Sequence, residues 1–331
     1  MKQKKDKNIT DPHDSFIKKV LKSKEDAKSL IKGVLPEEIK QIIRLETIRL
    51  QPDSFVDASL KKSFSDIVYQ VDGLSNMRFN VSFIIEHKSF VPKVNIKLQL
   101  IQYFIGATLT QVQQNIMPPA LPIIILLYDG NKDWQNEPLW TVFGDVPEIF
   151  RPFIPDFEFI QVDFNDYDDE KIKHVFDSYK IRATVMLMRD IHKNLEFVKT
   201  FQALLEEISK RLPETGAVEY LKLMLYYLQN YSEGKYREAE NVIKEISTKK
   251  NGTMNIVDEL IEKGIAEGSI SKSAEAALKM IQRKMSDEEI TYITSLSREE
   301  VNLLRNLYNQ HKETAVEYIE IQDGKIILRK D

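Results

Sequence analysis

The sequence predicts an α/β domain followed by an all-helical C-terminal region. Short apolar strand patterns recur in the first half of the chain, and a helical pattern separates two of them, as in a parallel crossover. From about Tyr167 the strand patterns stop and helical periodicity takes over. We therefore expect an α/β domain over residues 8–166, a helical region over 167–250 and a small helical unit over 251–331, with a terminal hairpin as an option.

The composition is that of a globular protein of about two domains. Hydrophobic residues make up 42% and charged residues 30% of the 331-residue chain. The longest apolar run, Leu121 to Leu127, is far shorter than the ~20 residues that span a bilayer, and the charged start of the chain lacks the apolar core of a secretory signal. Cysteine is absent, which excludes disulfides and thiolate metal sites. We expect a cytoplasmic protein without a membrane partner.

The charge of the chain bears on nucleic-acid binding. A net charge of −4 argues against a protein that coats nucleic acid through bulk electrostatics. Lysines nevertheless cluster between Lys18 and Lys32, which fits either a local basic patch or the solvated face of a helix.

The first half of the chain is predicted to begin with a helix over residues 16–33 that ends at a glycine. Residues 45–50 and 64–71 have strand patterns, and the second of them alternates cleanly between two faces. Asp72-Gly73 is typical of a turn, after which residues 77–88 form the returning strand.

A helix and two further strands complete the predicted α/β domain. Residues 94–113 place apolar side chains on one side of a helix, and residues 121–128 form a continuous apolar run. Such a run suits a strand that is buried on both faces, as in a parallel crossover after a helix. Residues 157–164 are a further candidate strand.

The second half is predicted to be helical over residues 169–209, 217–231 and 235–247. Two capping boxes follow, one formed by Ser286 with Glu289 and the other by Ser297 with Glu300. They predict short helices over residues 287–294 and 298–310, which follow a predicted helix over 273–284 in the sequence.

The end of the chain, residues 319–328, is predicted as a strand or as a hairpin around Asp323-Gly324. We interpret the short helices before it as a packing or dimerisation unit. DNA reading by a helix-turn-helix is the alternative, which the scarcity of basic residues disfavours.

The main candidate for a catalytic site is Glu86-His87-Lys88, which directly follows the predicted apolar strand Val81 to Ile85. Side chains alternate along a strand, so Glu86 and Lys88 share one face and His87 occupies the other. With Asp66 on the neighbouring predicted strand, two carboxylates and a lysine form the minimal set for metal-dependent phosphodiester hydrolysis. The alternative is a surface salt bridge between Glu86 and Lys88 at a strand edge.

An ordered series of motifs spans roughly the first half of the chain. It consists of His13-Asp14 with Phe16-Ile17-Lys18, Leu35-Pro36, Ser54-Phe55-Val56-Asp57, Ser65-Asp66-Ile67-Val68-Tyr69, Ile85-Glu86-His87-Lys88-Ser89, Tyr103 and Tyr128-Asp129-Gly130. This series resembles the recombination-promoting nuclease, or transposase-like, family of the PD-(D/E)XK nuclease superfamily. The resemblance implies a restriction-endonuclease-like core, with a mixed central sheet flanked by helices, and a DNA endonuclease with a role in recombination or mobile DNA.

The resemblance also implies roles for single residues. Asp66 and Glu86 match the acidic ligands of Mg²⁺, with Mn²⁺ or Ca²⁺ as alternatives, and Lys88 is the lysine of the wider superfamily where this family often has glutamine. The chain departs from the family on the following helix, where Gln99 and Gln102 replace arginines before Tyr103. This change removes two positive charges that could contact the phosphate backbone.

Other polar residues receive accessory or structural interpretations. Asp14 is either an additional acidic ligand or, as we favour, the N-cap of the helix from Phe16 onward. Glu46 is an accessory acid only if its strand lies beside Asp66. His87 is expected to be a packed or hydrogen-bonded histidine rather than a ligand. His174, His192 and His311 are expected to be isolated surface residues on helices.

The sequence thus predicts a metal-dependent DNA endonuclease, with a homodimer as an option. A nucleotide cofactor is not expected, because the chain has no glycine-rich phosphate loop. Two rivals remain open: a catalytically silent DNA-binding or regulatory protein on the same scaffold, and an interaction protein built around the helical half.

Overall fold

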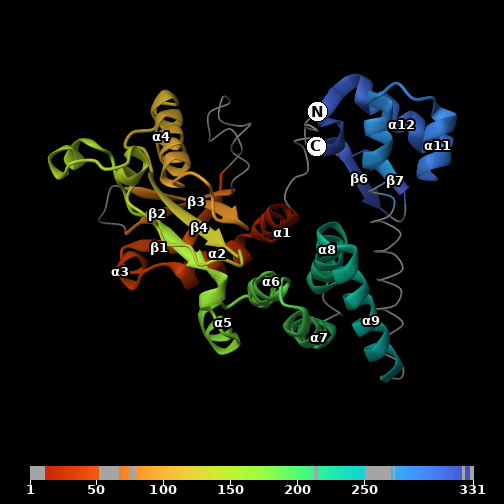
Figure 1. The fold of residues 1–331 in the computed structure, drawn as a ribbon, viewed down its shortest axis with the longest axis horizontal. Helices are drawn as coiled ribbons and strands as arrows, with labels where there is room; N and C mark the ends of the chain where they lie inside the picture. The colour runs from red at the N-terminus through yellow and green to blue at the C-terminus, as the bar shows by residue number, and fades with distance from the viewer. Residues whose placement is uncertain are drawn as a thin grey trace. The chain divides into compact units, whose positions relative to one another are not determined.

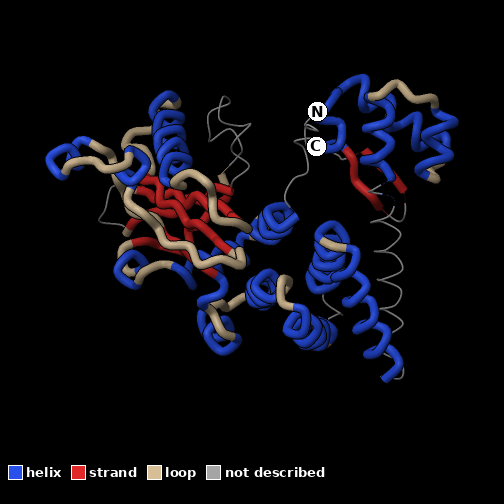
Figure 2. Tube along the Cα trace, viewed as in Figure 1, coloured by secondary structure: helices blue, strands red, loops and turns tan. Residues whose placement is uncertain are grey.

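The computed structural model describes residues 12–51, 67–74, 79–211, 215–249, 270, 273–322 and 325–328. The chain divides into two compact units, Met1–Leu204 and Leu205–Asp331, and the boundary falls inside helix α7 (Asn194–Ser209). The first unit contains the central sheet, whereas the second consists of helices and one small hairpin (Figure 2).

The first unit is built on a five-stranded sheet in the order β1-β2-β3-β4-β5 (Figure 1). Its strands are β1 (Ile43–Leu50), β2 (Ile67–Gly73), β3 (Asn80–Lys88), β4 (Leu121–Tyr128) and β5 (Ile160–Asp163). The pairs β1/β2 and β2/β3 are antiparallel, and the pairs β3/β4 and β4/β5 are parallel. The sheet is therefore mixed, which confirms the predicted α/β class.

The predicted parallel crossover is also confirmed. Helix α4 (Lys97–Gln113) connects β3 to β4 and covers one face of the sheet (Figure 1). Its apolar residues pack with those of the strands in one core, formed by Val68, Ile84, Ile96, Leu100, Tyr103, Ala107, Ile124, Leu126 and Phe159. Strand β4 has a partner strand on each side, and its last five residues are buried, which fits its continuously apolar sequence.

The opposite side of the sheet carries three helices that contact one another: α1 (Pro12–Leu21), α2 (Lys24–Val34) and α6 (Tyr179–Asp190). Two short helices lie next to them in the sequence: α3 (Glu37–Lys40) follows α2, and α5 (Asp169–Val175) precedes α6. The hydroxyl of Tyr69 on β2 donates a hydrogen bond of 2.7 Å to the carbonyl of Leu21 at the end of α1. Burial, reinforced by the charge of Asp26, raises the pKa of Tyr69 to about 12. The neutral hydroxyl thus ties the helical layer to the sheet.

The helix predicted over residues 16–33 is wrong in its bounds, because it is two helices. Ser23 breaks the run: its side chain accepts a hydrogen bond from the backbone N–H of Asp26 and caps α2. Gly33 does not end the helix but lies inside α2, where a Cβ would lie 2.7 Å from the Phe176 ring. Gly33 therefore permits close packing against Phe176 and does not mark the end of the helix.

Three strand bounds also differ from the predictions. The expected turn at Asp72-Gly73 is part of β2, where Asp72 pairs with Asn80, so the chain reverses after Gly73. Strand β3 begins at Asn80, after the non-strand residue Phe79, and residues 77–78 of the predicted strand lie outside the described residues. The last strand of the sheet spans Ile160–Asp163 rather than 157–164. Strand β1, at Ile43–Leu50, confirms the expected strand over 45–50.

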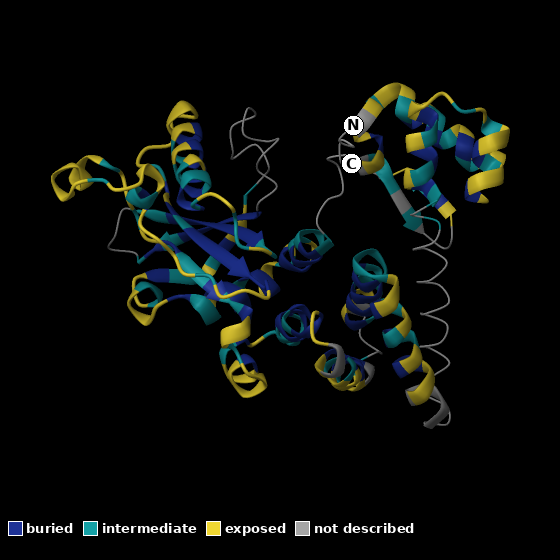
Figure 3. Ribbon diagram, viewed as in Figure 1, coloured by how far each residue is buried: buried dark blue, intermediate teal, exposed yellow. Residues whose placement is uncertain are grey.

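A long connection between β4 and β5 carries two 3₁₀ helices, η2 (Leu139–Phe143) and η3 (Glu148–Phe153). Figure 3 shows this connection exposed along much of its length. It returns to the core through Asp156, whose carboxylate accepts a hydrogen bond of 2.6 Å from the Lys97 ammonium at the start of α4. A third 3₁₀ turn, η4 (Phe164–Asp166), follows β5.

Replacing Asp156 by alanine is expected to lower the free energy of unfolding by about 2 kcal/mol, because the buried ammonium of Lys97 loses its counter-ion. Burial raises the pKa of Asp156, but hydrogen bonding from Lys97 and the backbone outweighs burial and leaves the pKa below its ordinary value. The pair therefore stabilises the fold above about pH 4 and weakens as the pH falls through the folded-state pKa.

Urea unfolding at neutral and acidic pH measures this effect. The double variant Lys97→Met with Asp156→Ala is the control, since an apolar side chain at position 97 needs no counter-ion. If the single and double variants lose equal stability, the ion pair is not the cause.

The second unit contains α8 (Thr215–Tyr231), α9 (Glu233–Lys249), a helix over residues 273–282, α11 (Asp287–Thr294) and α12 (Arg298–His311). Both predicted capping boxes are confirmed at Ser286 and Ser297. After the 3₁₀ turn η5 (Lys312–Tyr318), the strands β6 (Ile319–Gln322) and β7 (Lys325–Leu328) pair antiparallel. The region is therefore not all helical: the hairpin is confirmed, and its tip at residues 323–324 lies outside the described part of the chain.

None of the described helices combines the length and the hydrophobicity needed to cross a membrane.

Candidate functional site

The end of strand β3 buries an acidic side chain in the middle of the sheet. Glu86 pairs with Leu126 of β4 and is only 5% exposed. Because β3 lies between β2 and β4, Glu86 is not at a sheet edge, and a simple surface salt bridge at an edge is excluded. The sequence folds this way because the alternating strand turns Ile84 and Glu86 toward α4, and the carboxylate comes just past the apolar core.

Three donors surround the Glu86 carboxylate. Oε1 accepts hydrogen bonds from the ammonium of Lys88 and from the amide of Gln99, the latter at 3.0 Å. Oε2 lies 3.4 Å from the hydroxyl of Tyr103, which also contacts the Gln99 amide. Lys88 and Glu86 share a strand face, as the two-residue spacing predicts, whereas Gln99 and Tyr103 come from one side of α4.

Lys88 links this buried carboxylate to solvent. Its side chain is 19% exposed, against 6% for Glu86. The contact therefore has a buried anionic end and a partly open cationic end. The arrangement thus places one anionic acceptor beside one partly exposed cationic donor.

The other acidic residue of the predicted site, Asp66, lies outside the described residues. The described part of β2 begins with Ile67, which pairs with Ile85, the residue before Glu86. The role of Asp66 therefore stays a prediction from the sequence.

Two accessory acids lie elsewhere. Asp14 is not an N-cap, because α1 begins at Pro12, a residue favoured in the first helical turn; Asp14 instead accepts a 2.7 Å hydrogen bond from Lys18. Strand β1 does lie beside β2, but Glu46 is exposed and falls between Arg44, which pairs with Asp72, and Arg49. Glu46, on β1, therefore lies beside the end of β2 that is distant from Ile67.

The two glutamines of α4 differ in position. Gln99 contacts the Glu86 carboxylate, whereas Gln102 is exposed to solvent. Of the two positions, only 99 therefore affects the Glu86 carboxylate directly. A neutral amide at this place donates a hydrogen bond without cancelling the charge of Glu86.

The opposite face of the sheet holds a second polar group, which we call the His–Asp cluster: His13, His87, Asp129 and His192. Asp129 is 1% exposed, and its two oxygens lie 3.0 Å from Nε2 of His87 and 2.8 Å from Nδ1 of His13. His87 is therefore a buried, hydrogen-bonded residue, as predicted. The His13 ring stacks between those of His87 and His192, at centroid distances of 6.1 and 5.6 Å.

The electrostatics of this cluster keep Asp129 ionised. Burial by itself raises the pKa of the Asp129 carboxyl, but the charges and hydrogen bonds of His87 and His13 outweigh burial and hold the pKa well below its usual range. An anionic carboxylate between two imidazoles is the result.

The expectation of isolated surface histidines on helices is wrong for His192 and His311. His192 is exposed but stacks on His13, and it lies in the turn after α6 rather than on a helix. His311, at the end of α12, stacks on Tyr318 at 3.7 Å. His174 is exposed on α5, as expected.

The sequence contained one usable signal for the His–Asp cluster. Asp129 directly follows a buried strand, and Lys88 pairs with Tyr128 in parallel register, so the residues after the two strands meet at the same edge. His13 and Asp129 both belong to the ordered series of motifs, but their spacing along the chain does not show that they meet. His192 gave no signal, and it lies almost 180 residues after His13 in the sequence.

Comparison with known proteins adds relatives that match most of the chain. The inactive recombination-promoting nuclease-like protein RpnE of Escherichia coli strain K12 is 24% identical, over 86% of this chain and 95% of that protein. The recombination-promoting nucleases RpnC and RpnA of the same strain are each 25% identical; the first match covers 90% of this chain and 98% of RpnC, the second 89% and 97% of RpnA.

No solved structure matches the chain, so a restriction-endonuclease-like core stays a prediction. The family model described as "Putative transposase, YhgA-like" matches residues 11–217. This stretch contains the whole sheet, the Glu86 carboxylate with its donors, and the His–Asp cluster. Since the match covers more than half of the chain, the protein belongs to the YhgA-like transposase family.

Proposed function

We propose that this protein is a metal-dependent DNA endonuclease whose site lies at the end of β3. The observation that carries the proposal is the buried carboxylate of Glu86, held beside the partly exposed ammonium of Lys88. A buried ion pair is weak support for stability, because desolvation offsets much of the attraction between the charges. Its position at the end of a central strand, where the apolar core stops, suits a binding site better than a structural role.

The donor chemistry fits a hard cation only in part. Glu86 offers the oxygen ligand that Mg²⁺ prefers, and Asp66, one residue before Ile67 in the sequence, is proposed to supply the second carboxylate. Mn²⁺ and Ca²⁺ are bound by the same ligand type. When bound, such a cation would neutralise charge on the scissile phosphate and lower the pKa of a bound water.

The chain's own residues supply the remaining functions. Lys88 is proposed to orient the attacking water and to stabilise negative charge that develops on the phosphate. Gln99 and Tyr103 hold the Glu86 carboxylate in place through hydrogen bonds to its two oxygens. They are positioning residues, because they act through Glu86.

The relatives support a nuclease or recombination role, since RpnC and RpnA carry the name recombination-promoting nuclease. A second candidate also has support: RpnE is named an inactive nuclease-like protein, so the scaffold occurs without activity. In that case this chain would be a DNA-binding or regulatory protein that does not cut DNA. The Glu86–Lys88 pair favours the active enzyme.

Supercoiled plasmid incubated with the full chain separates the two candidates. We expect nicking with Mg²⁺, none with EDTA, and none with the Asp66→Ala variant in either condition. DNA binding by a gel-shift assay is measured in parallel. Binding without nicking under Mg²⁺, Mn²⁺ or Ca²⁺ would support the silent scaffold and reject the nuclease.

A further inference from the structure

Three potential metal ligands converge within the His–Asp cluster, on the sheet face opposite Glu86. They are His13 near the start of α1, Asp129 directly after β4, and His192 in the turn after α6. One ligand atom from each lies within 4.8 Å of the others. Among the described residues, no other group of three or more histidine and carboxylate side chains approaches this closely.

The donor set selects the class of metal. Two imidazoles and one carboxylate suit zinc and related transition ions, whereas Mg²⁺ takes oxygen ligands almost entirely. Three protein ligands leave a fourth tetrahedral position for water. The exposure of His192 gives that position access to solvent, and the burial of His13 and Asp129 provides a rigid base.

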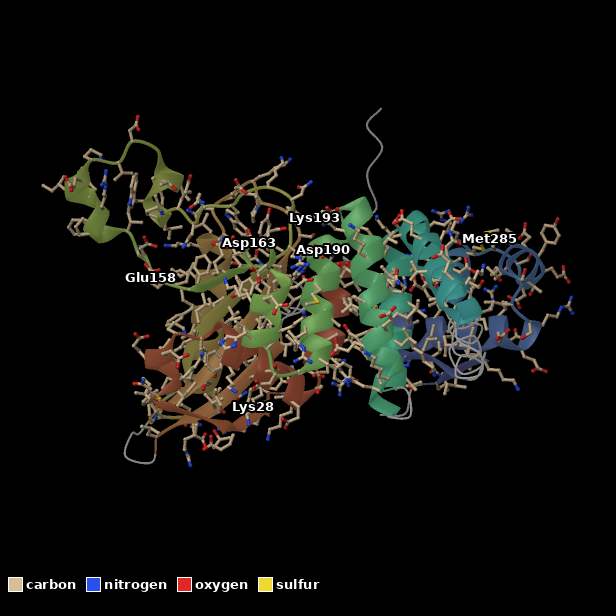
Figure 4. The ribbon with its side chains drawn as sticks, turned by 90° about the horizontal axis from the view of Figure 1, so that it is seen from below. Lys28, Glu158, Asp163, Asp190, Lys193 and Met285 are labelled. Carbon is tan, nitrogen blue, oxygen red and sulfur yellow. The ribbon has the colours of Figure 1, made fainter. Side chains whose placement is uncertain are left out.

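The surroundings of the three ligands resemble those of a built metal site. Asp129 uses its second oxygen to contact His87, so the ligating carboxylate is oriented by a further hydrogen bond. The turn that carries His192 is held through Asp190, which accepts hydrogen bonds of 2.6 Å from Arg189 and 2.7 Å from Thr200. Figure 4 labels Asp190 and Lys193, which flank this turn.

The geometry requires only small adjustments to admit an ion. In a tetrahedral zinc site with bonds of about 2.0 Å, ligand atoms lie about 3.3 Å apart. The His13–Asp129 contact of 2.8 Å would widen slightly, because an imidazole nitrogen that binds a metal carries no proton. The exposed side chain of His192 would rotate inward to close the remaining distance.

We propose that His13, Asp129 and His192 form a zinc-class metal site that is separate from the Glu86 site. The two sites lie on opposite faces of β3, since Glu86 and His87 are successive residues of one strand. The second site goes beyond the proposed nuclease function and does not depend on it. Its ion would join α1, the end of β4 and the turn after α6.

Zinc binding by the full chain is the direct test, measured by competition with a chromophoric chelator after dialysis against EDTA. We expect one Zn²⁺ per chain in the wild type. His192→Ala should weaken binding more than about 100-fold, because changes to outer-shell residues alone cost about 10- to 100-fold. His192→Cys should restore much of the affinity, since a thiolate replaces the lost ligand.

Matched variants locate the ion and keep the test independent of nuclease activity. His174→Ala removes an exposed histidine from α5, and Glu86→Gln alters the other face of the sheet; both should bind Zn²⁺ as the wild type does. Absence of zinc binding in the wild type would overturn the proposal. So would equal losses for His192→Ala and His174→Ala, or a loss that follows Glu86→Gln instead.

Discussion

Glu86→Gln is expected to reduce Mg²⁺-dependent plasmid nicking by about 100-fold or more. The amide keeps the size of the side chain but removes the negative charge, so the proposed cation loses a ligand and Lys88 loses its counter-ion. Initial nicking rates at several Mg²⁺ concentrations measure the effect. Higher Mg²⁺ should not restore the wild-type rate, because the missing charge also positions Lys88.

Glu170→Gln is the matched control for this variant. Glu170 lies on α5 in the same unit, and its side chain is 86% exposed, so the same chemical change should leave the rate unaltered. Circular dichroism of both variants checks that each remains folded. A folded Glu86→Gln protein that nicks plasmid at the wild-type rate would remove Glu86 from the proposed site.

Asp129→Ala is expected to lower the free energy of unfolding of the metal-free protein by about 3 kcal/mol. The change removes a buried carboxylate that binds His13 and His87, and both buried imidazoles are left without this acceptor. The contacts that join α1 to the ends of β3 and β4 weaken with it. Urea unfolding in the presence of EDTA, followed by circular dichroism, measures the loss.

Asp133→Ala provides the comparison, because Asp133 is exposed on the same connection after β4. Its unfolding free energy should stay within about 0.5 kcal/mol of the wild type. If Asp129→Ala unfolds at the same urea concentration as Asp133→Ala, the His–Asp cluster does not stabilise the fold.

The local patterns of the sequence predicted those parts of the fold that depend on near neighbours. The alternation of β3, the apolar run of β4 and the apolar side of α4 each depend on side-chain spacing within one element. The capping boxes at Ser286 and Ser297 are equally local, since three residues separate the partners. The bounds predicted for the first helix were wrong, because Ser23 caps a second helix inside the predicted one and Gly33 does not end it.

The spacing of residues along β3 was enough to predict that Glu86 and Lys88 share one strand face and that His87 occupies the other, because a strand repeats every two residues. What those side chains contact depends on the packing of distant segments. Gln99 and Tyr103 reach Glu86 because α4 packs on the face of the sheet that carries Glu86. Asp129 lies close to His13 and His192 because separate segments of the chain pack on the opposite face. Spacing along the chain carries no record of such distant contacts, which form only when the layers pack.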